Sequence, residues 1–502
     1  MRLHIADLLR TAAIVNPHGV AATLRDDRMT FAELDANADR LAAALATAGM
    51  KAGDTVAWWS SPSLTSIAGF AAAARAGAVF TSLNPALADQ EAAAALGYLE
   101  PRLLVAGGPL AEKAAEIFDG ESVSVDPAGS SPLPLLGDAA GGPGDTPPVW
   151  TDFDETDAHI VYLTSGTTGT PKGVVVSHRA SWLRAFPGGS TFADGLRGRG
   201  GILAAFPLFH YGGWHFVLEA WQHGCAFHMC DRFDGETIAS VASKQRPSAM
   251  YCIPALWERL LDTAGQDDLA SVLHADTGTS AAPPDLIARI KRHLPQATTS
   301  VLYGSSEGGH HTTLFDWDLE GHPGSVGRAA PPGAVRIDRT GEILYRSPTL
   351  MSGYLNRPGE TREALRDGWY HTGDLGVMDG DGYLYITGRL REVIRTGGET
   401  VSPSEVEAAL RSFPGVEDLA VVGLADGTWG EIVTAAVVCA PGITTPGVSE
   451  LRDHLGDKLA AFKHPRAVIA IERIPRTPAT GQVQRTLLVD ELTRLSPQRR
   501  NT

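Results

Sequence analysis

The stretch VYLTSGTTGTPKGVVVSH (161–178) decides how this chain is read. A β-like VYLT enters a loop rich in glycine and hydroxyl side chains, and VVV leaves it. Glycines let a backbone approach an anion closely, hydroxyls donate hydrogen bonds, and Lys172 adds a cation. The spacing departs from the GxxxxGKS/T pattern of a Walker A loop. We therefore predict a phosphate-binding loop of another kind, with these members: Thr164, Ser165, Gly166, Thr167, Thr168, Gly169 and Lys172.

Strands and helices alternate on either side of this loop. Residues 30–48 carry a capping box, Thr30 with Glu33, and apolar residues at helical spacing, so we expect a helix there. Residues 54–60 predict a strand and residues 66–78 a helix of small residues. The alternation continues to residues 301–304. It indicates α/β subdomains with parallel sheets covered by helices.

The pattern changes twice further along the chain. Residues 127–149, rich in Pro, Gly and Ser, predict a surface loop. Beyond about residue 330, short alternating runs predict a β-rich subdomain. From about residue 392 an α+β unit follows, with helices at 402–413 and 448–459 and strands at 419–424 and 432–440. We expect a large N-terminal domain, 1–390, and a small mobile C-terminal domain, 391–502.

Bulk composition limits the function. The 502 residues are 43% hydrophobic and 20% charged, which is typical of a globular protein, and the net charge of -16 disfavours nucleic acid as a partner. No long apolar segment predicts a signal peptide or a membrane span. Four cysteines form no disulfide framework, so a cytoplasmic location is expected.

One cluster of histidines and cysteines invites a metal interpretation. His223, Cys225, His228 and Cys230 lie close in sequence. Residues 225–230 resemble a short buried strand, whose alternation puts Cys225 on the face opposite His228 and Cys230. We favour the buried strand over a tetrahedral metal site.

Six further motifs accompany the loop in a fixed order. TSGTTGTPKG resembles the phosphate-loop signature of the adenylate-forming superfamily, which includes acyl- and aryl-CoA synthetases, nonribosomal peptide adenylation domains and firefly luciferase. The similarity runs through nearly the whole chain. The other motifs are FAELDANADRLA near the start, PLFHYGG (207–213), YGSSEGG (303–309), DGWYHTGDLG (367–376), YLYITGRLREVIRTGGETVSPSEVE (383–407) and PRTPATGQVQR (475–485).

The resemblance implies a role for each ATP-facing residue. It implies that Tyr303 stacks on adenine and that the next residue, Gly304, also belongs to the nucleotide site. It also implies that Ser306 contacts phosphate and that Glu307 binds Mg²⁺. Asp374 is expected to grip the ribose hydroxyls and Arg389 the ribose or a phosphate. The stretch Gly278, Thr279, Ser280 matches the loop that lines the adenine and acyl pockets, where the family usually has Gly-Gly-Ala.

The resemblance also implies a hinge and a substrate pocket. Arg391 matches the hinge position, and the loop 396–399 matches the one that lines the pantetheine tunnel of CoA ligases, so transfer to CoA or to a carrier-protein thiol is permitted. His210 is expected to act in catalysis and, as the aromatic gate, to line the pocket. The other expected pocket residues are Tyr211, Gly212, Cys252, His310 and His311. The histidine pair is predicted to bind a carboxylate or small anion, or to move a proton near neutral pH.

The motif PRTPATGQVQR breaks the family pattern. Gln482 stands where the family has a catalytic lysine, and Ala479 is an apparent insertion. Losing one preorganised electrostatic group costs about 2.7–4 kcal/mol. Three explanations compete: Lys463 substitutes, the enzyme acts mainly in thiol transfer, or the nucleophile that attacks ATP is not an ordinary carboxylate.

The sequence therefore leaves three functions open. We expect ATP-dependent, AMP-forming activation of a small aromatic acid, as in acyl- or aryl-CoA ligases of secondary metabolism. The first alternative is a diazotase, which activates nitrite for transfer to an aryl amine. The second is an inactive adenylate-binding pseudoenzyme, opposed by the retention of Lys172, Glu307 and Asp374.

Overall fold

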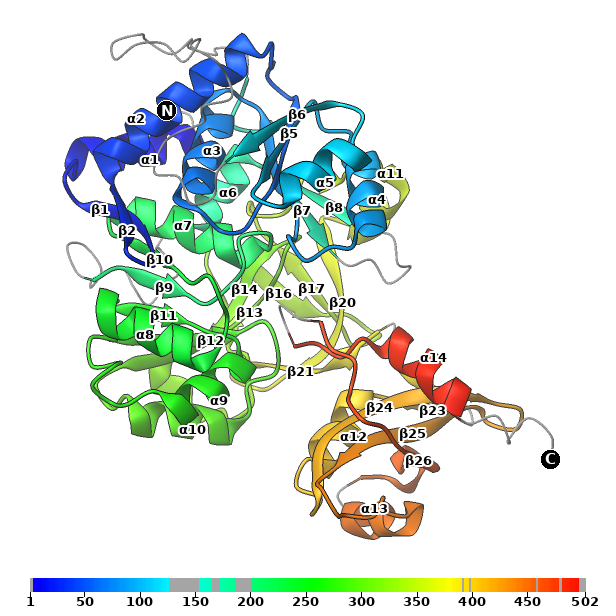
Figure 1. The fold of residues 1–502 in the computed structure, drawn as a ribbon. Coiled ribbons are helices and arrows are strands. Elements are labelled where there is room, and N and C mark those ends of the chain that lie inside the picture. Colours follow the sequence, from blue (N-terminus) through cyan, green and yellow to red (C-terminus); the bar gives the residue numbers. More distant parts are fainter. Residues whose placement is uncertain are drawn as a thin grey trace. The chain divides into compact units, whose positions relative to one another are not determined.

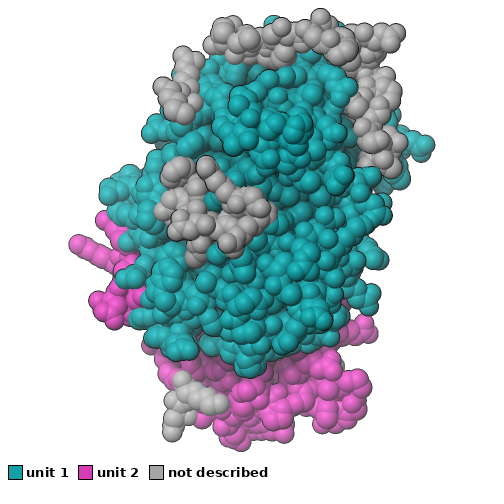
Figure 2. Space-filling view, turned by 90° about the vertical axis from the view of Figure 1, so that its left-hand side faces the viewer, with its two compact units in different colours: residues 1–335, 345–370 teal, residues 336–344, 371–502 magenta. Residues whose placement is uncertain are grey.

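The computed structural model describes residues 3–125, 153–164, 172–185, 200–390, 392–396, 399–456, 459–477 and 481–495. The chain forms two compact units, Met1–Val335 with Tyr345–Tyr370, and Arg336–Leu344 with His371–Thr502 (Figure 2). The mixed α/β fold, with a large N-terminal and a small C-terminal part, confirms the predicted class. The hinge boundary expected at 390/391 stays a prediction, and the loop expected at 127–149 lies outside the described residues.

The largest sheet belongs to unit 1 and has nine strands within the described ranges (Figure 1). Its central strands are parallel, and its two edges end in antiparallel pairs. In spatial order the strands are β15 (Arg328–Ala329), β14 (Gly309–Leu314), β13 (Thr298–Ser305), β12 (His274–Gly278), β11 (Ala249–Tyr251), β9 (Ile202–Ala204), β10 (Phe227–Met229), β1 (Val20–Leu24) and β2 (Asp27–Thr30).

The direction of these strands positions the site. β9, β11, β12 and β13 run parallel, so their carboxyl ends meet at one edge of the sheet. Ligands of open α/β sheets bind at that edge. The segments that follow these four ends are 205–210, 252–253, 279–283 and 306–308. They carry the predicted site residues His210, Cys252, Thr279, Ser280, Ser306 and Glu307.

A second sheet of unit 1 holds the two strands that flank the predicted phosphate loop. β7 pairs with β8 in the antiparallel direction, and it pairs with its neighbour on the other side in the parallel direction. In order the strands are β18 (Gly353–Tyr354), β8 (Lys172–Ser177), β7 (Ala158–Thr164), β4 (Val79–Ser82), β3 (Thr55–Trp59), β5 (Leu103–Gly107) and β6 (Glu121–Val125).

Helices of unit 1 pack against these two sheets (Figure 1). They are α1 (Ile5–Val15), α2 (Phe31–Thr47), α3 (Leu64–Arg75), α4 (Asp89–Leu99), α5 (Leu110–Ile117), α6 (His178–Arg184), α7 (Tyr211–His223), α8 (Gly235–Gln245), α9 (Pro254–Thr263), α10 (Pro284–His293) and α11 (Pro358–Ala364). The helix predicted at 66–78 starts and ends earlier than expected, because Ser63 caps α3 and Gly77 takes a left-handed conformation after it.

The β-rich part predicted beyond residue 330 is confirmed as a sheet whose residues are assigned to both units. It comprises β16 (Ala334–Ile337), β17 (Glu342–Arg346), β20 (Trp369–Met378), β19 (Leu365–Arg366) and β21 (Leu384–Arg389). Unit 2 has a further sheet of β23 (Glu399–Val401), β22 (Ile394–Thr396), β25 (Gly430–Cys439), β24 (Val416–Asp426) and β26 (Ala467–Ala470), with helices α12 (Pro403–Leu410), α13 (Val448–Leu455) and α14 (Arg485–Leu495).

Unit 2 has its own apolar core on both faces of this sheet. Val421, Val433 and Leu451 belong to one cluster, and Ala436, Leu488 and Leu492 to the other. The helices and strands predicted beyond residue 392 are confirmed, each within a few residues of its expected ends. Across the described ranges of the whole chain, no helix has the length and apolar character that crossing a membrane requires.

The capping box predicted at α2 forms as expected. The Glu33 backbone N–H donates to Thr30 Oγ1 at 3.3 Å, and Thr30 N–H donates to Glu33 Oε2 at 2.8 Å. Phe31, Leu34 and Leu41 bury the inner face of the helix. The cap matters because it satisfies backbone donors that the first helical turn leaves unpaired.

We predict that Thr30→Ala lowers the free energy of unfolding by about 1 kcal/mol, the usual value of an N-cap. Thr47→Ala, at the exposed C-terminal end of the same helix, is the matched control and is expected to change it by less than about 0.5 kcal/mol. Denaturant unfolding of both variants makes the measurement. Equal effects of the two substitutions would contradict the capping role.

Candidate active site

The predicted phosphate loop connects two strands that pair up to its edges. Thr164 and Lys172 lie opposite each other at the ends of β7 and β8, and Thr164 Oγ1 donates to the Lys172 carbonyl at 3.3 Å. Ser165, Gly166, Thr167, Thr168 and Gly169 lie outside the described residues. Lys172 forms an ion pair with Glu360, and its Nζ lies 5.1 Å from the centre of the Tyr354 ring. The antiparallel strands thus hold the lysine at the base of the loop.

Glu307, the predicted Mg²⁺ ligand, is held by its side chain and by its backbone. The Tyr354 hydroxyl donates to Glu307 Oε1 at 2.9 Å, and the Met351 N–H donates to the Glu307 carbonyl at 2.7 Å. Tyr354 therefore contacts both Lys172 and Glu307. A carboxylate fixed in this way suits a hard cation such as Mg²⁺.

Arg184, the last residue of α6, binds the backbone around Glu307. Its Nε donates to the Thr349 carbonyl at 2.8 Å, Nη1 to the Ser306 carbonyl at 3.0 Å, and Nη2 to the Glu307 carbonyl at 2.9 Å. The residue is only 7% exposed. Its guanidinium also lies over the Tyr211 ring, 5.1 Å from the ring centre. Arg184 thus contacts both the predicted nucleotide-binding residues Ser306 and Glu307 and the predicted substrate wall, which is the set of expected pocket residues around Tyr211.

The predicted adenine loop places a β-branched residue in a conformation that favours glycine. A Cβ at Gly278 would lie 2.2 Å from the Leu302 carbonyl oxygen, so only glycine fits there. Thr279 has φ +72°, which is strained for threonine. The Tyr251 hydroxyl and Thr279 Oγ1 lie 2.7 Å apart and form a hydrogen bond that holds this turn, with Ser280 following it. Tyr303 is buried, and its ring meets that of His311 edge-on at 5.0 Å.

Aromatic rings gather around the predicted substrate residues at the N-terminus of α7. His210 occupies the N-cap position of the helix, and the Phe209 ring centre lies 4.5 Å from that of His210. Tyr211 meets Tyr162 edge-on at 5.6 Å, and Gly212 follows in the first turn. Burial lowers the pKa of His210 to about 4, and its Nε2 is buried without a hydrogen-bond partner. Neutral His210 is therefore the form present near pH 7.

The histidine pair on β14 divides between two environments. His311 is fully buried and stacks on Tyr345 with ring centres 4.2 Å apart. His310 is partly exposed, and its Nε2 donates to the Thr312 carbonyl at 2.9 Å. Burial lowers the pKa of His310 to about 4 and that of His311 to about 3. Both rings are therefore neutral at pH 7 in this structure, and the prediction that the pair binds a carboxylate or small anion, or moves a proton, stays a prediction.

Of the four residues considered for metal binding, His228 makes two hydrogen bonds within the protein. His228 Nε2 donates to the Gly200 carbonyl at 2.5 Å, and its Nδ1 accepts from the Thr23 hydroxyl at 2.8 Å. Cys252 is fully buried, and burial raises the pKa of its thiol well above the ordinary value. Within the described ranges, no group of three or more His, Cys, Asp or Glu side chains is arranged to hold a metal ion.

Helix α7 carries polar residues that the sequence analysis missed. His215 and Glu219 follow Tyr211 at intervals of four, and His215 Nε2 lies 3.7 Å from Glu219 Oε2. Tyr211 and His215 are also joined, with 3.3 Å between the hydroxyl and Nδ1. Three polar residues on one face of an apolar helix were a readable signal. Arg184 and Tyr354 gave no comparable signal, because their contacts join segments far apart in sequence.

The remaining predicted nucleotide residues belong to unit 2. Asp374 and Arg389 are directly opposed on β20 and β21, and Arg389 Nε lies 3.1 Å from Asp374 Oδ1. Asp374 is 7% exposed, whereas the Arg389 side chain is 54% exposed. The register of one hairpin therefore brings together two residues that the sequence separates. Arg391, the predicted hinge, lies outside the described residues.

Gln482 occupies an exposed turn of unit 2. Its N–H donates to Thr477 Oγ1 at 3.1 Å, and its carbonyl accepts from the Thr477 N–H at 2.8 Å. Lys463, the proposed substitute cation, has its Nζ 2.6 Å from Glu405 Oε1. The inserted Ala479 lies outside the described residues.

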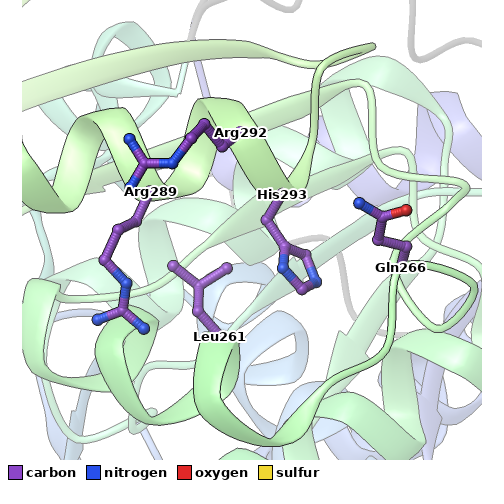
Figure 3. Close-up of a pocket in the computed structure, with 5 residues that line it drawn as sticks. All are labelled: Leu261, Gln266, Arg289, Arg292 and His293. Atoms are coloured by element: carbon purple, nitrogen blue, oxygen red, sulfur yellow. The ribbon is translucent and has the colours of Figure 1, made fainter.

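A hollow of about 220 Å³ lies elsewhere on unit 1, between α9 and α10 (Figure 3). It is lined by Leu261, Gln266, Arg289, Arg292 and His293. Arg289 is paired with Asp262 at 2.7 Å. None of the lining residues belongs to the predicted site.

Two models of known protein families match most of the chain. The model of AMP-binding enzymes matches residues 9–355, and that of the AMP-binding enzyme C-terminal domain matches residues 405–480. The chain belongs to the AMP-binding enzyme family. It is an adenylate-forming, AMP-forming ligase.

Similar proteins of this family match over nearly their whole length. The long-chain-fatty-acid–CoA ligase FadD13 of Mycobacterium tuberculosis is 32% identical over 98% of this chain and 99% of its own. Feruloyl-CoA synthase of Amycolatopsis is 32% identical over 94% and 97%. Among solved structures, ATP-bound MatB from Rhodopseudomonas palustris (28% identical, TM-score 0.86) covers 99% and 100%, and the amide bond synthetase McbA from Marinactinospora thermotolerans (28%, 0.85) covers 97% and 99%.

We predict that Asp374→Ala weakens ATP binding about 10- to 150-fold, because a charge-assisted hydrogen bond is worth about 1.5–3 kcal/mol. Asp381→Ala, an exposed aspartate in the turn between β20 and β21, is the control and is expected to bind like wild type. Isothermal titration with ATP and Mg²⁺ measures both. Wild-type affinity of the Asp374 variant, at unchanged thermal melting, would contradict the ribose role.

Proposed function

We propose that this ligase adenylates the carboxylate of a small aromatic acid, releases pyrophosphate, and transfers the acyl group to an acceptor. The observation that supports an aromatic substrate is the set of rings at the predicted substrate wall. Besides the contacts of Tyr211 and His210, Phe216 meets Tyr251 at 4.9 Å and Phe206 meets Tyr251 at 6.1 Å. Such rings bind another aromatic ring edge-on or offset.

A small substrate is supported by the turn at residues 278–280. The resemblance predicts Gly-Gly-Ala there, whereas this chain places Thr279 against the Tyr251 hydroxyl. The added side chain takes space that a long acyl chain would need. The name of the feruloyl-CoA synthase relative, an enzyme for an aromatic acid, agrees with this proposal.

We assign the chain's own residues as follows. Lys172 and the loop 164–169 hold the phosphates of ATP, and Asp374 and Arg389 hold the ribose and a phosphate. Glu307 would hold Mg²⁺, which supplies positive charge to the phosphates when bound. Arg184 fixes the backbone of Ser306 and Glu307, so that the carboxylate is preorganised. CoA or a carrier-protein thiol is the acceptor that the loop 396–399 would receive.

The second candidate is ATP-dependent activation of nitrite for transfer to an aryl amine. Two observations favour it: Gln482 replaces the catalytic lysine in an exposed turn, and Lys463 is engaged by Glu405. Nitrite oxygen would attack the α-phosphate and displace pyrophosphate. The amine nitrogen would then attack the nitroso nitrogen and release AMP, and loss of water would leave the diazonium product.

The deciding experiment follows pyrophosphate and AMP. The purified chain is given ATP and Mg²⁺ with a panel of aromatic acids, each with and without CoA, and separately with nitrite and an aryl amine. Acid-dependent release of AMP and pyrophosphate supports the first proposal, and nitrite-dependent release supports the second. Stoichiometric ADP and phosphate would contradict both, and no turnover with any substrate would support the pseudoenzyme.

We predict the effect of Gln482→Lys from the same assay. We expect no gain, because the substitution occurs together with an apparent insertion that would displace the new ammonium, and a site rebuilt for another nucleophile would also give none. If the chain is a plain acid ligase, adenylation of acids should rise by up to roughly 10²–10³-fold. A gain of that size on acids, with no reaction of nitrite in either protein, would exclude the nitrite proposal.

A further inference from the structure

Helix α7 carries a row of polar side chains that begins at the predicted substrate residue Tyr211. Tyr211, His215, Glu219 and His223 are spaced by four, so they lie along one face of the helix. The row begins beside Arg184, whose guanidinium covers the Tyr211 ring, and ends deep in unit 1. Glu219 is 2% exposed and His223 is 5% exposed, whereas Tyr211 and His215 are only partly buried.

The proton of His215 has a defined position. Burial, with His310 and Arg184 nearby, lowers the pKa of His215 to about 3, so the ring is neutral and carries one N–H. Its Nε2 lies 3.7 Å from Glu219 Oε2, longer than a hydrogen bond but close enough for the negative charge of a carboxylate to favour a proton on Nε2. We therefore assign the ring proton to Nε2, which leaves Nδ1 as an acceptor.

The hydroxyl of Tyr211 is oriented by this arrangement. It lies 3.3 Å from His215 Nδ1, and it is the donor of that bond because Nδ1 has no proton. Burial raises the pKa of Tyr211, so the phenol keeps its single proton at neutral pH. With that proton directed to His215, the Tyr211 oxygen can only accept a hydrogen bond from a substrate.

We propose that Tyr211, oriented by His215 and Glu219, selects an aromatic substrate that carries an N–H or O–H donor on its ring. This inference rests on the proposed function and names the substrate class of the same site. His310, which neighbours His215, adds a second acceptor nitrogen, because its Nε2 proton is directed to the Thr312 carbonyl and its Nδ1 is left unprotonated. An aryl amine and a phenol share the required chemistry.

Substituted benzoic acids separate these possibilities. Amino and hydroxyl substituents donate hydrogen bonds, methoxy only accepts, and methyl does neither. Each compound is titrated calorimetrically into wild-type enzyme with a non-hydrolysable ATP analogue and Mg²⁺. We expect donor-bearing rings to bind about tenfold more tightly than their methoxy and methyl counterparts, the value of one hydrogen bond in a buried site. The amino and hydroxyl arms show which donor is preferred.

Glu219→Gln tests the orientation directly. The amide that this substitution introduces can donate to His215 Nε2 and move the ring proton to Nδ1, which then donates to the Tyr211 oxygen. The Tyr211 hydroxyl becomes a donor to the substrate, so we expect the preference to reverse in favour of methoxy. Glu219 and His215 are positioning residues, and a purely structural role would weaken all four ligands equally.

Two further variants complete the design. Glu236→Gln makes the same chemical change on the exposed face of α8 and should keep the wild-type order. His215→Phe leaves the Tyr211 hydroxyl without its histidine acceptor and should abolish discrimination in either direction. Thermal melting checks that each variant folds, and a low melting point in Glu219→Gln leaves the wild-type ligand order as the deciding result.

The outcomes for the inference and for the proposed function are distinct. Equal binding of all four benzoates, tighter binding of methoxy by wild type, or binding of none would overturn the inference. Pyrophosphate release with aromatic acids regardless of substituent would overturn it while keeping the proposed function. Donor-selective binding without any acid-dependent pyrophosphate release would overturn adenylation of acids and keep the selective site.

Discussion

The three hydrogen bonds from Arg184 to backbone carbonyls are the contact on which the site of unit 1 depends. The carbonyls belong to Ser306, Glu307 and Thr349, and without the guanidinium they would lose these bonds at buried or partly buried positions. The same guanidinium covers Tyr211. One side chain therefore fixes the backbone that presents the Mg²⁺ carboxylate and the ring that begins the substrate wall. Both halves of the site would be expected to respond to a change at this residue.

Burial sets the chemistry of the substrate wall. His210, His215 and His310 all have pKa values lowered to about 3 or 4 because the charged ring would lose its hydration. Neutral imidazoles act through the position of one proton, and the groups around each ring decide that position. The neutral side chains of this wall are thus suited to accept hydrogen bonds from donor groups on an aromatic ring. An anion placed against it would need its positive partner elsewhere.

Much of this architecture could be predicted from local sequence. The capping box at Thr30, the alternating strand patterns and the glycine-rich loop are decided by residues a few positions apart, and the structure has the helix and strands where those signals put them. The motifs named the site residues, but their place after the carboxyl ends of the parallel strands came from the structure. The sequence predicted both ends of α3 too late in the chain, because the N-cap at Ser63 was not recognised.

The remaining features depend on contacts between distant segments. Arg184 reaches residues 122–165 positions away, and nothing in the sequence around it indicates a buried arginine. The left-handed conformation of Thr279 follows from its packing against Tyr251. The charge state of His310 and His311 follows from burial, which the residue names do not give. The face of α7 was readable, but only its relation to Arg184 shows why it matters.

The most direct test of this account is the affinity for ATP of Arg184→Lys. Lysine keeps the charge but cannot serve three carbonyls in a plane, so we predict that titration with ATP and Mg²⁺ gives affinity at least about tenfold weaker than wild type. Arg179→Lys, an exposed arginine on the same helix α6, is the control and should bind ATP normally. Equal affinity of the two variants, with both folded, would contradict the central role of Arg184.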